Sequence, residues 1–256
     1  MTPTVAEPLV RQLLPFQPGD ADVERAYDIP RGTRGTRPHV LVNMVASTDG
    51  ATVVDGVTAK LGSPGDKRVF ALLRSLADVI LVGAQTVRAE RYGPPKLDDA
   101  GRQRRIARGQ TPLPRIAVLT RSLNLDWSSR LFSDPTARPL VLAPESADPA
   151  ALSAARAVSD VLVAGQGVVD LTFALGELSR SGVSTVLCEG GPTLNAQLAE
   201  QGLIDELCLT ISPSLVGGAT RPGIIGAAHL PEMIGLKLLH VLEEDGFLLL
   251  RYATAG

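Results

Sequence analysis

The chain has 256 residues, 45% of them hydrophobic and 20% charged, which suits one large α/β domain or two small ones. The formal net charge is -2 and only 4% of the residues are aromatic, so neither charge nor stacking side chains indicate a nucleic-acid binder. The two cysteines, Cys188 and Cys208, form neither a zinc motif nor a disulfide framework, and we expect both to be buried thiols.

Residues 1–36 are predicted to form an N-terminal arm and linker. They contain several prolines and acidic residues, a short helical possibility at 8–14, and a Gly-rich basic stretch at 30–36. The arm either lies in solvent or covers a dimer surface. No secretory signal opens it, and no segment of the chain approaches the ~20 apolar residues of a membrane span. We therefore expect a cytoplasmic protein without a membrane partner.

Strands and helices alternate through the predicted domain, residues 37–256. The predicted strands lie at residues 39–45, 78–83, 115–120, 138–142, 158–163, 184–188 and 205–212. The predicted helices lie at residues 63–76, 85–90, 149–157, 169–180 and 193–201. The first helix has the clearest start, with Ser63 as N-cap, Pro64 at the first position and Asp66 in the first turn.

Residues 93–114 interrupt this alternation. They are rich in Pro, Gly and charge, and Arg102, Arg104, Arg105 and Arg108 lie close together. We predict a long surface excursion there, either a solvated basic loop or a loop that contacts an anion.

The order of the elements predicts an α/β fold with a mainly parallel central sheet and helices on both of its faces. Strands at 236–244 and 247–252 flank the turn pair Asp245-Gly246. This pattern predicts a C-terminal antiparallel hairpin at one edge of the sheet.

Candidate ligand-binding residues gather where predicted strands end, because open α/β sheets bind ligands at the carboxyl ends of their strands. The strand at 184–188 runs into glycines and a helix start, which could bring backbone N–H groups to a phosphate or could only turn the chain. This junction consists of Glu189, Gly190, Gly191, Pro192, Thr193 and Leu194. At a second strand end, Gly83 opens a helix that carries Thr86 and Val87.

A third strand end carries Thr120, Arg121 and Ser122. A guanidinium between two hydroxyls suits a phosphate monoester such as the 2′-phosphate of NADP, although the same residues also form plain turns. Asp49 is the only carboxylate in these turns that directly follows an otherwise apolar strand, and it is either a turn residue or a functional acid. The histidines at 39, 229 and 240 are isolated in apolar settings, and we expect core or edge residues there.

Several common nucleotide and catalytic motifs are absent from the sequence. No G-x-G-x-x-G follows the first strand, and there is neither a P-loop nor a G-x-S-x-G nucleophile elbow. In order and spacing, however, the chain resembles the pyrimidine reductase of riboflavin biosynthesis, the C-terminal reductase domain of a bifunctional deaminase-reductase, over roughly residues 37–252. The matching segments are 37–50, 73–88, 167–171, 189–195, 202–207 and 211–218.

The resemblance implies a dihydrofolate-reductase-like fold, usually dimeric, that binds NADPH. The implied reaction, of the 5-amino-6-(5-phosphoribosylamino)uracil reductase type, reduces a phosphoribosylamino-pyrimidine to its ribitylamino form. By the same resemblance, Asp49 is the substrate-side acid, Gly190 to Thr193 cradle the pyrophosphate, and the Gly190–Gly191 bond is cis. The other implied cofactor residues are Gly83, Thr86, Val87, Thr120, Arg121, Ser122, Glu189 and Leu194. No metal ligand is implied.

The sequence departs from this family after Arg88, where the common pattern has a pair of aspartates, a proline and a later arginine near the substrate phosphate. Here residues 89–94 read AERYGP. The substrate therefore stays open between the pyrimidine and dihydrofolate or another pterin, and a non-catalytic nucleotide-binding protein is the remaining alternative. Residues 1–36 lack a zinc-deaminase pattern, so we expect at most the reductase half.

Overall fold

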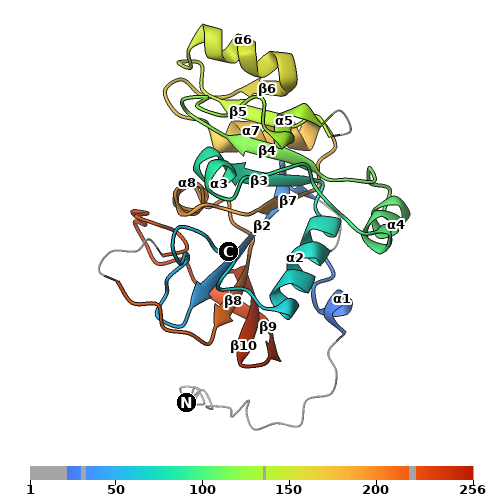
Figure 1. Ribbon diagram of the computed structural model, residues 1–256, viewed down its shortest axis with the longest axis vertical. Helices are drawn as coiled ribbons and strands as arrows, with labels where there is room; N and C mark the ends of the chain where they lie inside the picture. The colour runs from blue at the N-terminus through green and yellow to red at the C-terminus, as the bar shows by residue number, and fades with distance from the viewer. Residues whose placement is uncertain (1–21, 30–32, 135–136, 219–222, 256) are drawn as a thin grey trace, which may run out of the picture.

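One mixed sheet organises the part of the chain that a computed structural model describes, residues 22–29, 33–134, 137–218 and 223–255. The sheet has ten strands, and nine of them follow the order β6-β5-β4-β3-β7-β2-β8-β10-β9, while β1 pairs with β2 (Figure 1). The strands are β1 (Thr33–Arg34), β2 (Arg37–Ser47), β3 (Val79–Gly83), β4 (Arg115–Leu119), β5 (Leu140–Ala143), β6 (Asp160–Val163), β7 (Thr185–Cys188), β8 (Glu206–Ser212), β9 (Leu236–Glu244) and β10 (Phe247–Thr254).

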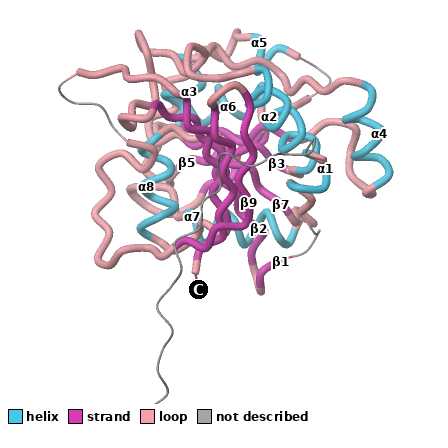
Figure 2. Tube along the Cα trace, turned by 90° about the horizontal axis from the view of Figure 1, so that it is seen from below, coloured by secondary structure: helices cyan, strands magenta, loops and turns pink. Residues whose placement is uncertain are grey.

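Helices lie on both sides of this sheet, as the edge view in Figure 2 shows. They are α1 (Val23–Ala26), α2 (Pro64–Leu76), α3 (Ala84–Ala89), α4 (Asp99–Ala107), α5 (Arg130–Ser133), α6 (Pro149–Val158), α7 (Leu171–Arg180) and α8 (Pro192–Glu200). The strands from β6 to β8 run parallel, and β10 is antiparallel to both β8 and β9. The predicted α/β fold, with a mainly parallel central sheet, helices on both faces and a C-terminal antiparallel hairpin, is therefore confirmed.

The alternation of side chains along the buried strands divides the core between the two faces. On one face, Val40 and Leu81 belong to a cluster that α7 and α8 cover with residues such as Leu175 and Leu198. On the other face, α3, α5 and α6 pack over β3, β4 and β5, and α2 packs over β2, β7 and β8. Cys188 and Cys208 are buried thiols on opposite faces, as predicted.

The first predicted helix begins as its sequence indicates. The Ser63 hydroxyl accepts a hydrogen bond from the backbone N–H of Asp66 at 3.0 Å, and Pro64 occupies the first turn of α2. The apolar face of α2 then buries Val69 and Leu73 against the sheet.

The segment 93–114 lies largely at the surface, but the prediction of a loop there is wrong, because it contains helix α4. Asp98 caps the helix by accepting from the Gly101 N–H at 2.8 Å, a signal that the density of arginines obscured. Arg105 is fully buried, and its guanidinium donates to the carbonyls of Thr111 at 2.7 Å and of Ala77. The helix α5 also lies where no helix was predicted.

Part of the predicted arm packs on the domain. Tyr27 and Ile29 are each 1% exposed and belong to the core cluster under α2. Residues 33–34 form β1 in the segment predicted to be a linker. The helical possibility at 8–14 lies outside the described residues, and the boundary at residue 37 stays a prediction.

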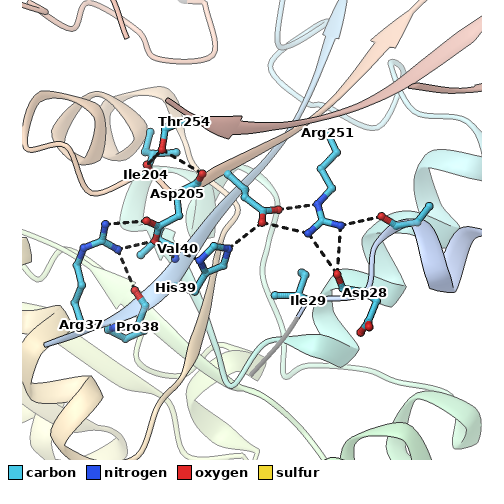
Figure 3. Close-up of polar contacts among 12 residues, drawn as sticks. Asp28, Ile29, Arg37, Pro38, His39, Val40, Ile204, Asp205, Arg251 and Thr254 are labelled. Atoms are coloured by element: carbon cyan, nitrogen blue, oxygen red, sulfur yellow. Dashed lines mark hydrogen bonds and ion pairs between the residues drawn. The ribbon is translucent and has the colours of Figure 1, made fainter. Parts of the chain in front are cut away.

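A buried polar network joins this N-terminal segment to the sheet (Figure 3). Arg251 on β10 donates to the Glu206 carboxylate at 2.7 Å and to the carbonyl of Ala26 at 2.8 Å. His39 contacts the same carboxylate at 3.1 Å. Burial alone would raise the pKa of Glu206, but the hydrogen bonds from His39 and Arg251 outweigh it and hold that pKa at about 2. Glu206 is therefore an ionised structural residue.

Replacing Arg251 should destabilise the fold because it leaves the Glu206 carboxylate buried with less compensation. We expect Arg251→Met, which keeps much of the side-chain volume, to lower the free energy of unfolding by about 3 kcal/mol. Urea denaturation measures this. Arg156→Met is the matched control, because Arg156 is exposed on α6, and it should change stability by less than about 0.5 kcal/mol. Equal effects of the two substitutions would show that the network does not hold the segment.

Candidate active site

A cleft of about 1400 Å³ lies at the carboxyl ends of β2, β3, β4 and β7. Its volume exceeds the roughly 300–1,000 Å³ of a typical small-molecule site, so it has room for two ligands side by side. Most of the predicted cofactor residues line it, although they come from three separate strand ends. They are Gly83, Thr86, Thr120, Arg121, Ser122, Glu189, Gly191, Pro192, Thr193 and Leu194.

The two glycines after β7 lie against the start of α3. The Gly190–Gly191 peptide bond is cis, as the resemblance implies, and Gly190 has a φ of +76°. The carbonyl of Gly190 accepts a hydrogen bond from the Gly83 N–H at 2.7 Å. A Cβ on Gly191 would stand 2.8 Å from the Thr86 Oγ1, closer than such atoms approach. Glycine at 191 therefore leaves room for the Thr86 hydroxyl where the two chain segments meet.

Beyond this contact, α8 presents its N-terminal end to the cleft. Its cap residue Gly191 has no side chain to cap the helix, and Pro192 occupies the first position, where no N–H is needed. An uncapped helix N-terminus carries partial positive charge and favours an anion such as a phosphate.

Two predicted cofactor residues lie behind the cleft rather than in its lining. Val87 is 6% exposed and packs into the core with Ile80 and Leu131. Gly190 is buried, and its role is the backbone hydrogen bond to Gly83. Both residues support the shape of the cleft, and their part in cofactor binding stays a prediction.

Of the three polar side chains in the turn after β4, one is buried and two are exposed. Thr120 is buried, and its hydroxyl accepts from the Leu123 N–H at 3.0 Å, which closes the turn. Arg121 and Ser122 are exposed at the cleft. Of the predicted hydroxyl–guanidinium–hydroxyl set, these two are the groups placed to meet a ligand.

Glu189 is held by a pair of cleft residues that the sequence reasoning missed. Arg74 on α2 donates to its two carboxylate oxygens, both at 2.7 Å, and the Tyr92 hydroxyl donates to one of them. Burial raises the pKa of Tyr92, and the negative charge of Glu189 raises it further, so the phenol stays protonated. With its oxygens engaged in this way, Glu189 is a buried acceptor that fixes Arg74 and Tyr92. Tyr92 lies in the hexapeptide that departs from the family pattern.

Asp49 does not line the cleft. Its carboxylate accepts from the Ser47 hydroxyl at 2.5 Å, the Gly217 N–H at 2.7 Å and the Val216 N–H at 3.2 Å. The hydrogen bond from Ser47, followed by those from Gly217 and Val216, lowers the pKa of this exposed acid to about 2. Asp49 is therefore ionised near neutral pH and tied to the loop after β8, which argues against a role as proton donor.

Basic side chains outnumber acidic ones around the cleft. The basic residues in its lining are Lys67, Arg74, Arg88, Arg91, Lys96, Arg121 and Arg130. The acidic ones are Asp66, Glu90 and Glu189, and Glu189 is already paired with Arg74. The excess of positive charge suits phosphorylated ligands. Most of these residues belong to no sequence motif, because they come from separate helices and loops.

Two other features are absent from the described residues. No cluster of His, Cys, Asp or Glu in that part of the chain is arranged to hold a metal ion. None of the helices there has the length and apolarity that a membrane span requires.

Comparison with known proteins agrees with this geometry. A 2,5-diamino-6-ribosylamino-4(3H)-pyrimidinone 5′-phosphate reductase of Archaeoglobus fulgidus is 31% identical over 192 residues, which cover 73% of this chain and 86% of the relative. The protein of the same name from Methanothermobacter thermautotrophicus is 29% identical over 86% of this chain and 100% of its own. The crystal structure of a pyrimidine reductase-like protein from Corynebacterium diphtheriae superposes with a TM-score of 0.79, at 28% identity, over 86% of this chain and 92% of that one.

The fold and the cleft define an oxidoreductase of the pyrimidine reductase type, which takes a nicotinamide cofactor. The family model described as the RibD C-terminal domain matches residues 38–246. The chain belongs to this family.

A side chain at position 191 should push apart the chain segments that follow β3 and β7. We expect Gly191→Ala to lower the free energy of unfolding by about 1–3 kcal/mol and to weaken cofactor binding, because its Cβ meets the Thr86 hydroxyl. Thermal unfolding and a fluorescence titration with NADPH measure the two effects.

Two further variants make this test specific. Removing the hydroxyl in the double variant Gly191→Ala/Thr86→Ala should restore part of the loss. Gly176→Ala in α7 is the control, because the nearest atom to its Cβ would be 3.7 Å away, and it should be neutral or slightly stabilising. An unaltered Gly191→Ala protein would contradict the close approach.

Proposed function

We propose that this protein reduces a phosphoribosylamino-pyrimidine of riboflavin biosynthesis, with NADPH as the hydride donor, in the cytoplasm. The observation that carries the proposal is that Gly191, at the start of α8, and the exposed Arg121 lie at separate strand ends of one cleft. The names of the relatives and the room for two ligands support it.

The residues present fit a dinucleotide with an extra phosphate. Gly191 leaves the space that a Cβ would fill, and the uncapped end of α8 offers partial positive charge to a pyrophosphate. Arg121 and Ser122 can hold the 2′-phosphate that distinguishes NADPH from NADH. When bound, the nicotinamide supplies the hydride, and the chain's own part is to position the two partners and exclude water.

On the substrate side, the chain supplies charge. Lys96 and Arg130 line the same cleft and offer positive charge to a substrate phosphate. Asp49, held ionised at the end of β2 and outside the cleft lining, would act on the substrate through its charge alone, which favours the positive charge on the ribosylamino group when its sugar reacts as an open imine. The proton that follows the hydride must then come from water or another group.

Arg121 should select NADPH over NADH. We expect Arg121→Ala to weaken NADPH about tenfold or more and to leave NADH nearly unchanged, because a hydrogen bond to a charged group contributes about 1.5–3 kcal/mol. Titrating the variant with both cofactors measures this. An equal loss for the two cofactors would remove the 2′-phosphate assignment.

Asp49 should affect turnover and not cofactor binding. Asp49→Asn keeps the shape and one acceptor oxygen, but it replaces the other oxygen with an amide group and removes the charge. We expect kcat to fall about 100-fold, as for the loss of one electrostatic contribution to the transition state, while the NADPH dissociation constant stays within about threefold of wild type. Asp126→Asn is a matched control, because Asp126 is also exposed and bonded to a neighbouring serine. Normal turnover of Asp49→Asn would leave Asp49 as a turn residue only.

We also propose that the protein is a homodimer. The edge strand β9 exposes apolar side chains that need cover, with Leu236 and Leu238 each 45% exposed. Light scattering at micromolar concentration should give the mass of two chains. A monomer mass would overturn this proposal.

The central assay follows NADPH oxidation with the riboflavin precursor and with dihydrofolate side by side. The proposed function expects turnover of the ribosylamino-pyrimidine. Turnover of dihydrofolate alone would make the protein a pterin reductase, and oxidation with neither would leave a nucleotide-binding protein without catalysis.

A further inference from the structure

The N-terminal end of α2 is completed by a residue from a distant part of the chain. Pro64 has no N–H to satisfy, and the Asp66 N–H donates to the Ser63 hydroxyl at 3.0 Å. The N–H between them, on Gly65, donates to Oε2 of Glu244, the last residue of β9. The tip of the C-terminal hairpin therefore supplies an acceptor that the first turn of α2 needs (Figure 1).

Glu244 makes two further contacts with the same helix end. Its Oε2 also accepts from the Ser63 hydroxyl at 2.9 Å, and its Oε1 accepts from the Arg68 guanidinium. Partial burial would raise the pKa of Glu244, but the hydrogen bonds from Ser63, Arg68 and Gly65 outweigh it, so this pKa lies below its usual value. Glu244 is therefore ionised near neutral pH, and its negative charge lies at the positive end of the helix.

Glycine at position 65 gives this carboxylate room to approach. Gly65 is buried in the first turn of α2, and a Cβ there would overlap Oε2 of Glu244. Alanine is otherwise the more favourable residue in a helix. The contact with Glu244 therefore accounts for a glycine at this position.

The helix end that Glu244 completes forms a wall of the cleft. Asp66 and Lys67 of the first turn line the cleft, and so does Phe70 one turn further along. The Thr210 hydroxyl on β8 donates to the Asp66 carboxylate at 2.7 Å, which places this turn beside β8. The proposed cofactor residues follow β3, β4 and β7, and β2 separates these strands from β8. The first turn of α2 therefore faces the part of the cleft that the cofactor leaves to the substrate.

The other end of α2 is fixed independently of the hairpin. Arg74, in the last turn, donates to both carboxylate oxygens of Glu189, which follows β7. Loss of the Glu244 contact therefore loosens the first turn of the helix and leaves its last turn in place beside the glycines that follow β7.

We propose that Glu244 is a positioning residue for the substrate. It acts through the first turn of α2, which it holds where the side chains of that turn meet the substrate. None of the described hairpin residues, 236–254, lines the cleft, so Glu244 itself touches no ligand there. This inference rests on the proposed function, because it assigns the α2 side of the cleft to the substrate.

Removing the carboxylate should weaken substrate binding and spare the cofactor. We expect Glu244→Ala to raise KM for the ribosylamino-pyrimidine about tenfold, with kcat and the NADPH dissociation constant within about threefold of wild type. A merely structural role would lower the free energy of unfolding without separating the two ligands. An unchanged KM, or an equal loss for both ligands, would overturn the proposal.

Glu243→Ala is the matched control for this variant. Glu243 is exposed on the same strand, and its carboxylate accepts from the Gly246 N–H within the hairpin turn. The control should keep the wild-type KM. A rise in KM as large as that of Glu244→Ala would overturn the proposal, because any change in the hairpin would then have the same effect.

Conservative variants separate the hydrogen bonds from the charge. Glu244→Gln keeps an oxygen that can accept from Gly65 and Ser63, so KM should stay within about threefold of wild type. Arg68→Ala removes an ion pair whose arginine is 63% exposed and should also stay near wild type. A loss in Glu244→Gln equal to that in Glu244→Ala would overturn the proposal, because the acceptor for the helix end would then not be what acts.

Gly65→Ala covers the case in which Glu244→Ala does not fold. The added Cβ displaces the carboxylate of Glu244, while alanine favours the helix, so this variant should fold and show the same rise in KM. A wild-type KM in Gly65→Ala would overturn the proposal.

Hydrogen exchange separates this inference from the proposed function, because it needs no turnover. In Glu244→Ala, the amides of residues 65–70 should exchange at least about fivefold faster than in the wild-type protein, and those of α3 at the wild-type rate. Faster exchange in α2, with no turnover of the ribosylamino-pyrimidine by the wild-type protein, would support the positioning contact and overturn the function. Wild-type turnover, with unchanged exchange and KM in the variant, would support the function and overturn the positioning role.

Discussion

The site depends on how closely the segments that follow two adjacent parallel strands approach each other. β3 and β7 are hydrogen-bonded neighbours, and their continuations stay in contact through the Gly83–Gly190 backbone bond and the packing of Gly191 on Thr86. Because no Cβ intervenes, α3 and α8 leave the sheet side by side and both border the cleft. A side chain at 191 would compete with the Thr86 hydroxyl for this space, and the junction would have to adjust.

The carboxylates at this end of the sheet differ in what they can do because their surroundings differ. Arg74 neutralises the charge of Glu189, and the Glu189 carboxylate also accepts a hydrogen bond from the Tyr92 hydroxyl. These bonds hold the three side chains in fixed positions in the cleft wall. Asp49 is exposed and fastens one loop to another. Asp66 is bonded on one oxygen only and is left with capacity toward the cleft. Three carboxylates at one end of a sheet therefore have three different chemical capacities.

Local signals explain why much of the fold could be predicted from the sequence. Capping at Ser63, apolar runs such as 79–82 and the turn pair Asp245-Gly246 act over a few residues, so the elements they mark were found. The error at α4 arose because the burial of Arg105 depends on carbonyls of distant chain segments, which a count of charges does not reveal. For the same reason, the strand-end motifs pointed to the cleft, while the partners of Glu189 and the donors around Asp49 emerged only from the folded arrangement.

The clamp around Arg251 has a consequence for how the domain can be shortened. The region that matches the family begins at residue 38, which suggests a natural point for truncation. Yet Tyr27 and Ile29 fill the core under α2, and the carbonyls of Ala26 and Asp28 satisfy part of the Arg251 guanidinium. A protein that begins at residue 37 would expose the apolar surface that Tyr27 and Ile29 cover, and the Arg251–Glu206 ion pair beside it would lose the backbone carbonyls that Arg251 binds. Exposed apolar surface of this kind favours aggregation. The packing of this domain therefore extends back to Val23 and Ala26, N-terminal to the region that matches the family.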